Sequence, residues 1–142
     1  MDIDARGPRF GAIITTVVLA LALATTSVWL LLAQALVFAV GAIAGMRFAP
    51  YGLVYRFLIR PRLGPPSRFE PLAPPRFAQG VGLVFAGIGV IGYAVGLTGV
   101  GIAFTALALA AAFLNAAFDF CMGCQMYLFI RRIRPSQRSA AA

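Results

Sequence analysis

The chain contains two long stretches without a charged residue, separated by a segment rich in arginine and proline. The uncharged stretches cover residues 10–45 and 77–118. A single helix needs about 20 apolar residues to cross a bilayer, so each stretch is too long for one crossing and must fold back on itself. The sequence therefore predicts four membrane-spanning helices, arranged as two hairpins.

Short polar clusters mark the predicted hairpin tips, at residues 25–27 and 97–101. We expect the helices at roughly 10–24, 28–45, 78–97 and 101–120. A cleaved signal peptide is the competing interpretation of the first helix. Two observations argue against it, since Asp2 and Asp4 stand in the head region and a second apolar stretch follows almost at once.

The composition supports the same class of protein. Hydrophobic residues make up 61% of the 142 residues and charged residues 11%, and the mean hydropathy is +0.91. A soluble domain carries about a quarter charged residues, and intrinsic disorder requires low hydrophobicity, so both classes are excluded. The sequence predicts an all-α integral membrane protein.

The basic residues all fall on one side of this four-span arrangement. They are Arg6, Arg9, Arg47, Arg56, Arg60, Arg62, Arg68, Arg76, Arg131, Arg132, Arg134 and Arg138. Because arginine-rich loops remain in the cytoplasm, the pattern predicts a multi-pass protein of the bacterial inner membrane with both termini cytoplasmic. We expect the net charge of +8 to attract anionic lipid headgroups, and we expect no nucleic-acid partner.

The two halves of the chain resemble each other. Pro-Arg-Phe precedes each predicted hairpin, at 8–10 and at 75–77. A basic segment with aromatic residues follows each hairpin, at 54–60 and at 126–132. These segments are typical of amphipathic helices at the cytoplasmic interface.

The correspondence predicts a single membrane domain, 1–142, built from two tandem repeats. The first repeat covers about 6–62 and the second about 73–134, followed by a disordered tail at 135–142. Each repeat has two spans, so the copies would share one orientation about an axis along the membrane normal.

Small residues recur at helical spacing on the third and fourth predicted helices. They are Gly82, Ala86, Gly89 and Gly96, with Tyr93 on the same face, and then Ala103, Ala106, Ala110 and Ala117. Such stripes predict close helix packing, either within the chain or in a homodimer. Two amides within the spans, Gln34 and Asn115, each need a hydrogen-bond partner or a polar cavity.

One C-x-x-C motif, formed by Cys121 and Cys124, carries most of the chemical information. It lies at the predicted cytoplasmic end of the fourth helix, where the reducing environment disfavours a permanent structural disulfide. Three interpretations stay open, namely a redox or persulfide relay, a soft-metal site, and two small residues that only pack. Asp119, close by, would either modulate the thiols or pair with an arginine.

The redox interpretation gains support from Pro50, which stands at the corresponding elbow of the first repeat. Proline favours the first turn of a new helix, so by analogy we expect the fourth helix to break near Gly123. Cys124 would then lie in the first turn of an interfacial helix, where backbone amides and the helix dipole stabilise a thiolate.

The metal interpretation has a different basis. Cys121, Cys124, Met122 and Met126 form a soft ligand set suited to Cu(I) or a related ion. Zinc or an iron–sulfur centre would need more thiolates, which a homodimer pairing two motifs would supply.

Several motifs together resemble one bacterial membrane family. They are Pro-Arg-Phe at 8–10, Ala-Pro-Tyr-Gly-Leu at 49–53, Arg-Pro-Arg-Leu-Gly-Pro at 60–65, Pro-Arg-Phe-Ala-Gln-Gly at 75–80 and Phe-Cys-Met-Gly-Cys at 120–124. The chain resembles domain of unknown function 4395 over roughly residues 4–134, with Cys121 and Cys124 at the family's C-x-G-C position. The resemblance implies a small multi-pass protein, frequent in actinobacteria, whose gene neighbours are thioredoxin-like and rhodanese-like. That association favours thiol or sulfur chemistry.

We therefore expect a thiol or persulfide relay, or a membrane anchor for thioredoxin-like or sulfurtransferase partners. Cys121 and Cys124 are the proposed redox pair, and no cofactor is expected for that role. A soft-metal or small-solute transporter and a structural scaffold without chemistry are the alternatives.

Overall fold

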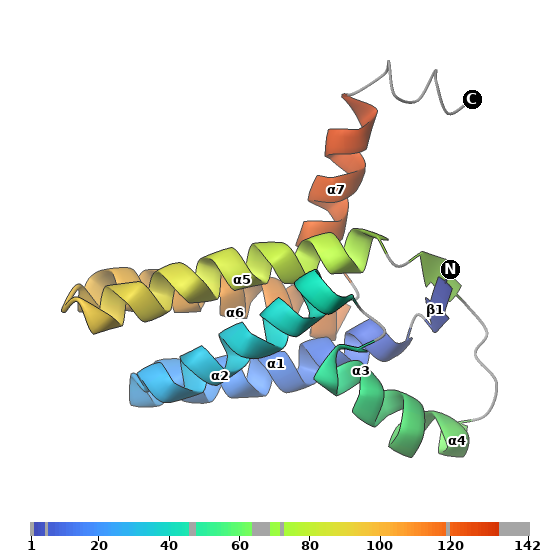
Figure 1. Cartoon of the computed structure of the whole chain (residues 1–142), viewed down its shortest axis with the longest axis horizontal. Coiled ribbons are helices and arrows are strands. Elements are labelled where there is room, and N and C mark those ends of the chain that lie inside the picture. The colour runs from blue at the N-terminus through green and yellow to red at the C-terminus, as the bar shows by residue number, and fades with distance from the viewer. Residues whose placement is uncertain are drawn as a thin grey trace.

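A computed structural model describes residues 2–4, 6–45, 48–63, 69–71, 73–118 and 120–133. Four apolar helical segments form an elongated bundle (Figure 1). They are α1 (Arg6–Thr25), α2 (Val28–Ala39) with its π-helical continuation η1 (Val40–Ala44), α5 (Ala73–Ala94) and α6 (Thr98–Phe118). The predicted helical fold class is confirmed.

The helices have the length and surface of membrane-spanning segments. Gly7–Thr25, Pro74–Ala94 and Thr98–Phe118 are each long and apolar enough to cross a bilayer, and Val28–Ala44 is a shorter apolar segment. Large apolar side chains that are more than half exposed cover the bundle, among them Val17, Leu21, Trp29, Leu36, Ile91 and Leu107. A soluble protein would bury such a surface, so these helices mark a membrane protein. A fourth crossing stays a prediction.

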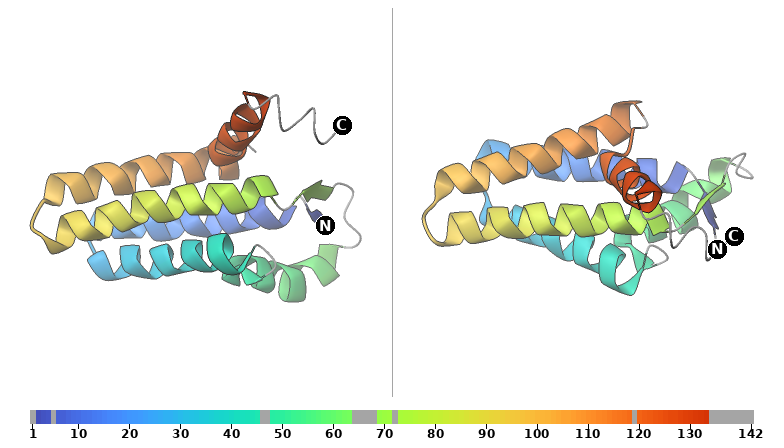
Figure 2. Two further views of the ribbon diagram at one scale, coloured as in Figure 1. Left: turned by 45° about the horizontal axis from the view of Figure 1, so that its top comes forward. Right: turned by 90° about the horizontal axis from the view of Figure 1, so that it is seen from above.

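The four segments close into a ring around one core. α1 packs against α2 and α6, and α5 packs against the same two helices (Figure 2). The buried core consists of Leu19, Ala22, Leu31, Ala35, Phe38, Ala86 and Ala108. Each hairpin therefore buries its inner face against the other hairpin.

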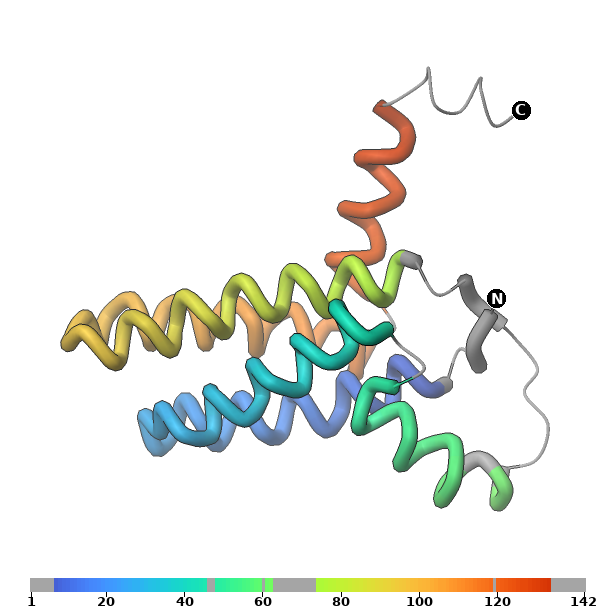
Figure 3. Tube along the Cα trace, in the orientation of Figure 1, coloured from blue at the N-terminus to red at the C-terminus, as the bar shows by residue number. Residues whose placement is uncertain are grey.

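Both hairpin tips lie at one end of the bundle, as the trace in Figure 3 shows. The first tip, at Thr26 and Ser27, is where the sequence predicts it. The second is at residues 95–97, which overlaps the beginning of the predicted 97–101. Gly96 ends α5 with φ +87°, and the amide of Leu97 donates to the Gly92 carbonyl at 2.7 Å, which satisfies a terminal carbonyl. The position of this turn is therefore determined by the backbone conformation of Gly96 and not by the polar threonine that follows it.

The shorter elements gather at the opposite end of the bundle (Figures 1 and 3). They are α3 (Pro50–Val54), η3 (Tyr55–Ile59), α4 (Arg60–Leu63), α7 (Met122–Arg132) and two strands, β1 (Asp2–Asp4) and β2 (Phe69–Pro71). The strands pair antiparallel with Ile3 opposite Glu70, an element that the sequence does not predict. The predicted tail at 135–142 lies outside the described residues.

Two arginines link the two hairpins through equivalent hydrogen bonds. Arg9 donates from Nε to the Ala116 carbonyl at 3.1 Å, near the end of α6. Arg76 donates from Nε to the Ala42 carbonyl at 2.7 Å and from Nη2 to the Ile43 carbonyl at 2.9 Å, in η1. Carbonyls at helix ends have no partner within the helix, and a cation there also favours the helix dipole.

The aromatic residues after each arginine also correspond. The rings of Phe10 and Tyr55 lie 5.6 Å apart between centroids, and those of Phe77 and Tyr127 lie 5.7 Å apart. Matched contacts of this kind are what two related units would produce, although the tandem repeat itself stays a prediction.

The small-residue stripe of α5 faces the inside of the bundle. A Cβ atom at Gly82 would lie 2.8 Å from the Phe38 ring, and one at Gly89 would lie 2.9 Å from Leu31 Cδ2. Both residues are contacted by α2, so the stripe serves packing within the chain.

The stripe predicted on α6 does not face the core of the bundle, so its packing in a homodimer stays a prediction. Ala103, Ala110 and Ala117 are exposed, whereas Gly101, Thr105 and Ala108 are buried. Thr105 donates its hydroxyl to the Gly101 carbonyl at 2.7 Å, which lets a polar residue occupy the core face.

We predict that Gly89→Leu lowers the free energy of unfolding in detergent by roughly 1–3 kcal/mol, because the new side chain overpacks the contact with Leu31. Gly87→Leu is the matched control, since a Cβ at Gly87 has nothing within 4 Å. Thermal unfolding followed by circular dichroism provides the comparison. Equal melting temperatures for the two variants would contradict the packing.

Candidate functional site

The helical path breaks between α6 and α7, close to where the sequence predicts. α6 ends at Phe118 and α7 begins at Met122, with Cys121 as its N-cap at φ −90° and ψ 104°. The Cys121 Sγ accepts a hydrogen bond from the Cys124 amide at 3.1 Å. Cys124 lies in the first turn of α7, as the sequence predicts, and its amide is donated to the sulfur of Cys121 at the capping position.

A close helix contact positions this break. A Cβ atom at Gly123 would lie 2.5 Å from Ala78 Cβ and 2.6 Å from Ala78 Cα, so a residue with a side chain does not fit without displacing the backbone. The Phe77 and Tyr127 rings meet one turn further along the same interface. The first turn of α7 therefore packs directly against the beginning of α5.

The two cysteines form a disulfide across this first turn. Their Cα atoms are 5.1 Å apart, within the range that a disulfide requires. Both residues are partly exposed, so the bond is accessible at the end of the bundle. The structure thus presents the oxidised form of the pair.

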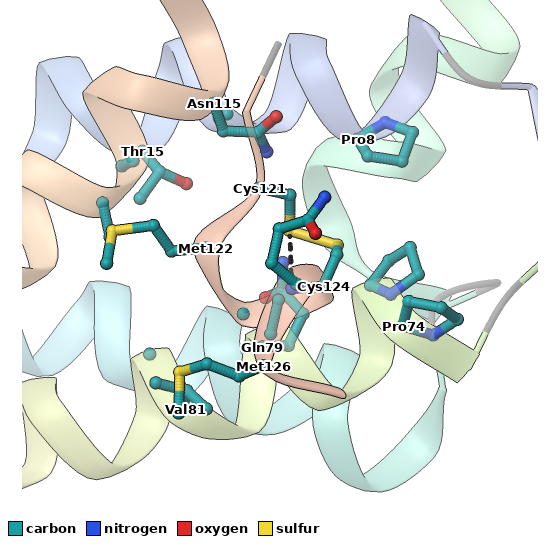
Figure 4. A pocket seen from close by; sticks show the side chains of 18 of the residues that line it. Pro8, Thr15, Pro74, Gln79, Val81, Asn115, Cys121, Met122, Cys124 and Met126 are labelled. Carbon is teal, nitrogen blue, oxygen red and sulfur yellow. Dashed lines mark hydrogen bonds between the residues drawn. A yellow bond between two sulfur atoms is a disulfide. The ribbon is translucent and has the colours of Figure 1, made fainter. Parts of the chain in front are cut away.

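The disulfide borders a cavity of about 390 Å³ at the end of the bundle opposite the hairpin tips (Figure 4). Residues of α1, α5, α6 and α7 form most of its wall. Many are small, including Ala12, Ala78, Gly82, Ala108, Ala111 and Ala112, and the polar residues include Thr15, Gln79 and Asn115. The space exists because few of the wall residues on α6 carry side chains beyond Cβ.

The sequence profile described as "Domain of unknown function (DUF4395)" matches residues 3–132, which include every element around the cavity. The chain belongs to this family. No curated protein and no solved structure matches the chain. The DUF4395 resemblance found in the motifs is therefore confirmed.

The two amides within the spans of this DUF4395 protein have different surroundings. The Tyr51 hydroxyl donates to Gln34 Oε1 at 2.7 Å, and Gln34 Nε2 donates to Thr15 Oγ1 at 3.5 Å. Burial raises the pKa of Tyr51, so its hydroxyl stays a neutral donor. Asn115 lines the cavity and makes no hydrogen bond with the described part of the chain. Gln34 is structural, whereas Asn115 offers an amide to whatever enters the cavity.

Two methionines beside the disulfide do not converge on it. Met122 is 44% exposed and Met126 46% exposed, and Figure 4 shows both side chains directed away from the cysteine sulfurs. Among the described residues, no group of three or more histidine, cysteine or acidic side chains is placed to hold a metal ion. The soft-metal set of two cysteines and two methionines stays a prediction. Asp119, the predicted modulator of the thiols, lies outside the described residues.

The electrostatic surroundings favour a negative charge on sulfur. The positive end of the α7 dipole is at Cys121, and Arg9 lines the same cavity. In the reduced state the Cys124 amide would donate to a Cys121 thiolate and stabilise its negative charge. The arrangement thus places a backbone amide and a helix N-terminus at the Cys121 sulfur.

Proposed function

We propose that this DUF4395 protein exchanges thiols and disulfides with a soluble partner at the cytoplasmic face of a bacterial inner membrane. The observation that carries the proposal is the position of Cys121 at the N-terminus of α7, where its sulfur accepts the Cys124 amide and is bonded to Cys124. If the two cysteines only packed against their neighbours, neither sulfur would have to lie at a helix N-terminus.

The exchange proceeds through one mixed disulfide. The Cys121 thiolate attacks a sulfur of the partner's disulfide, so one S–S bond forms and the partner's other sulfur leaves as a thiolate. The Cys124 thiolate then attacks the Cys121 sulfur, which forms the Cys121–Cys124 disulfide and releases the partner as a dithiol. When a partner's dithiol reduces the Cys121–Cys124 bond, the same intermediate forms in the reverse order.

The surface around the pair supports a protein partner. The exposed thioethers of Met122 and Met126 flank the disulfide, and methionine side chains adapt to varied apolar surfaces. A thioredoxin-like or sulfurtransferase-like protein, whose own reactive sulfur must be accessible, has the chemistry required. This DUF4395 protein would hold such a partner at the membrane while the sulfurs react.

The arrangement of charge supports the proposed orientation. Arg9, Arg76 and Arg131 lie at the end of the bundle that holds α7, away from both tips. With four crossings, that end faces the cytoplasm. α7 leaves the bundle at a steep angle to its axis (Figure 1) and exposes Phe129, Ile130 and Ile133 beside its arginines. Such a helix is suited to the headgroup region.

Topology is testable with single cysteines in a variant that lacks Cys121 and Cys124. We expect Thr26→Cys and Leu97→Cys to react with an impermeant maleimide in intact cells, because both tips face outward. Arg62→Cys should react only after permeabilisation. Labelling of Arg62→Cys in intact cells, or protection of Thr26→Cys, would contradict the orientation or the fourth crossing.

Exchange is testable with a thioredoxin variant in which serine replaces the resolving cysteine and the nucleophilic cysteine carries a thionitrobenzoate group. We expect reduced Cys124→Ser to release the coloured thionitrobenzoate and to accumulate a covalent complex, because Cys121 attacks and no resolving thiol remains. Cys121→Ser should react about tenfold or more slowly at neutral pH, because the thiolate fraction sets the rate.

The wild-type protein is the control for resolution, since it should end as the Cys121–Cys124 disulfide with free thioredoxin. Equal rates for Cys121→Ser and Cys124→Ser would contradict the assignment of the nucleophile. Failure of both variants to form a complex would contradict the exchange function itself.

A further inference from the structure

The cavity beside the disulfide lies between the membrane-spanning helices, at the end of the bundle opposite the hairpin tips. Its wall comes from α1, α5 and α6, with α7 closing it at Cys121 and Cys124. A volume of about 390 Å³ is within the range of small-molecule sites. Because most of its wall is apolar and belongs to helices that are long and apolar enough to cross a bilayer, the cavity is suited to a lipid-soluble ligand.

The mixture of apolar and polar side chains in the wall indicates which chemical groups the ligand carries. Alanine and glycine side chains, such as those of Ala12, Ala111 and Gly82, give an apolar surface, while Asn115 and Gln79 add side-chain amides. Asn115 forms no hydrogen bond with the described residues, so its N–H groups remain available. Asn115 is partly buried, and a ligand with a carbonyl oxygen would accept a hydrogen bond from its amide.

The disulfide itself fixes the chemical class of the ligand. Cys121 and Cys124 both line the cavity, so a ligand that fills it lies beside the disulfide. Reoxidising a dithiol removes two electrons and two protons, and an apolar molecule with two carbonyl oxygens that accepts both is a quinone. A phospholipid acyl chain fits the apolar wall but uses neither the amides nor the sulfurs.

We propose that the cavity binds a membrane quinone, which oxidises the reduced Cys121–Cys124 pair. The two S–H bonds break and the S–S bond forms, while the two electrons and two protons convert the quinone to the quinol. Asn115 donates to one quinone oxygen, and the quinone ring lies against the alanines of α6. This inference rests on the proposed thiol exchange, because electrons reach the pair from the soluble partner's dithiol.

The test uses the reduced full-length protein in detergent micelles without oxygen, with decylubiquinone as the probe. We expect quinone absorbance to fall while a Cys121–Cys124 disulfide forms, as followed by mass after thiol labelling. Ala111→Phe fills the cavity and should slow this reaction about tenfold or more, because overpacking excludes the ring. Ala110→Phe is the matched control, since Ala110 is exposed on the same helix.

A second variant keeps the proposal falsifiable if Ala111→Phe is poorly folded. Asn115→Leu removes the amide and should raise the KM for the quinone about tenfold without changing the rate of exchange with thioredoxin. Oxidised glutathione, which does not need the cavity, should oxidise all variants at the same rate.

The outcomes separate the two proposals. If thioredoxin exchange proceeds but no quinol forms, or if Ala111→Phe and Ala110→Phe react equally with the quinone, the quinone site is overturned and the exchange function stands. Stabilisation by phospholipid alone, without any oxidation by the quinone, would assign the cavity to a lipid. If neither the quinone nor thioredoxin reacts with the pair, the exchange function fails as well.

Discussion

The missing side chain of Gly123 lets the first turn of α7 lie directly against Ala78 of α5, and the site depends on this contact. With a Cβ atom at 2.5 Å from Ala78 Cβ, any larger residue would push α7 away from the bundle. The contact turns the chain out of α6 and makes Cys121 the N-cap of a new helix. A C-x-x-C motif on an uninterrupted helix would lack the capping hydrogen bond that distinguishes its two sulfurs.

Two further features of the bundle explain why the N-terminus of α7 borders a cavity. Arg9 binds the end of α6 through the Ala116 carbonyl, and Arg76 binds η1 in the same way, so each hairpin is held by the other. Alanines on the inner face of α6 then leave space that larger side chains would fill. Small residues in a bilayer usually allow helices to approach closely. Beside the disulfide they instead leave a cavity lined by Asn115.

The sequence predicts the helical class, the hairpins and the break before α7, because hydrophobic length and arginine placement act over many residues. It places the second tip about two residues too late, because the left-handed geometry of Gly96 outweighs the polar residues that follow it. It places Cys124 in the first turn of α7 but does not identify Cys121 as the N-cap, since that position depends on where α6 ends to within one or two residues. The cavity, and the position of Asn115 in its wall, depend on how four helices pack against one another in space. The spacing of apolar residues along the chain does not contain this information.

The central claim is that Cys121–Cys124 is a reversible redox pair and not a permanent crosslink, and its reduction potential tests this most directly. Equilibration of the purified protein in glutathione buffers, with the thiols counted by mass, gives the potential. Stabilisation of the reduced form at the α7 N-terminus predicts a value between about −270 and −120 mV, the range of exchange proteins. A potential below about −300 mV, typical of structural disulfides, would contradict the account.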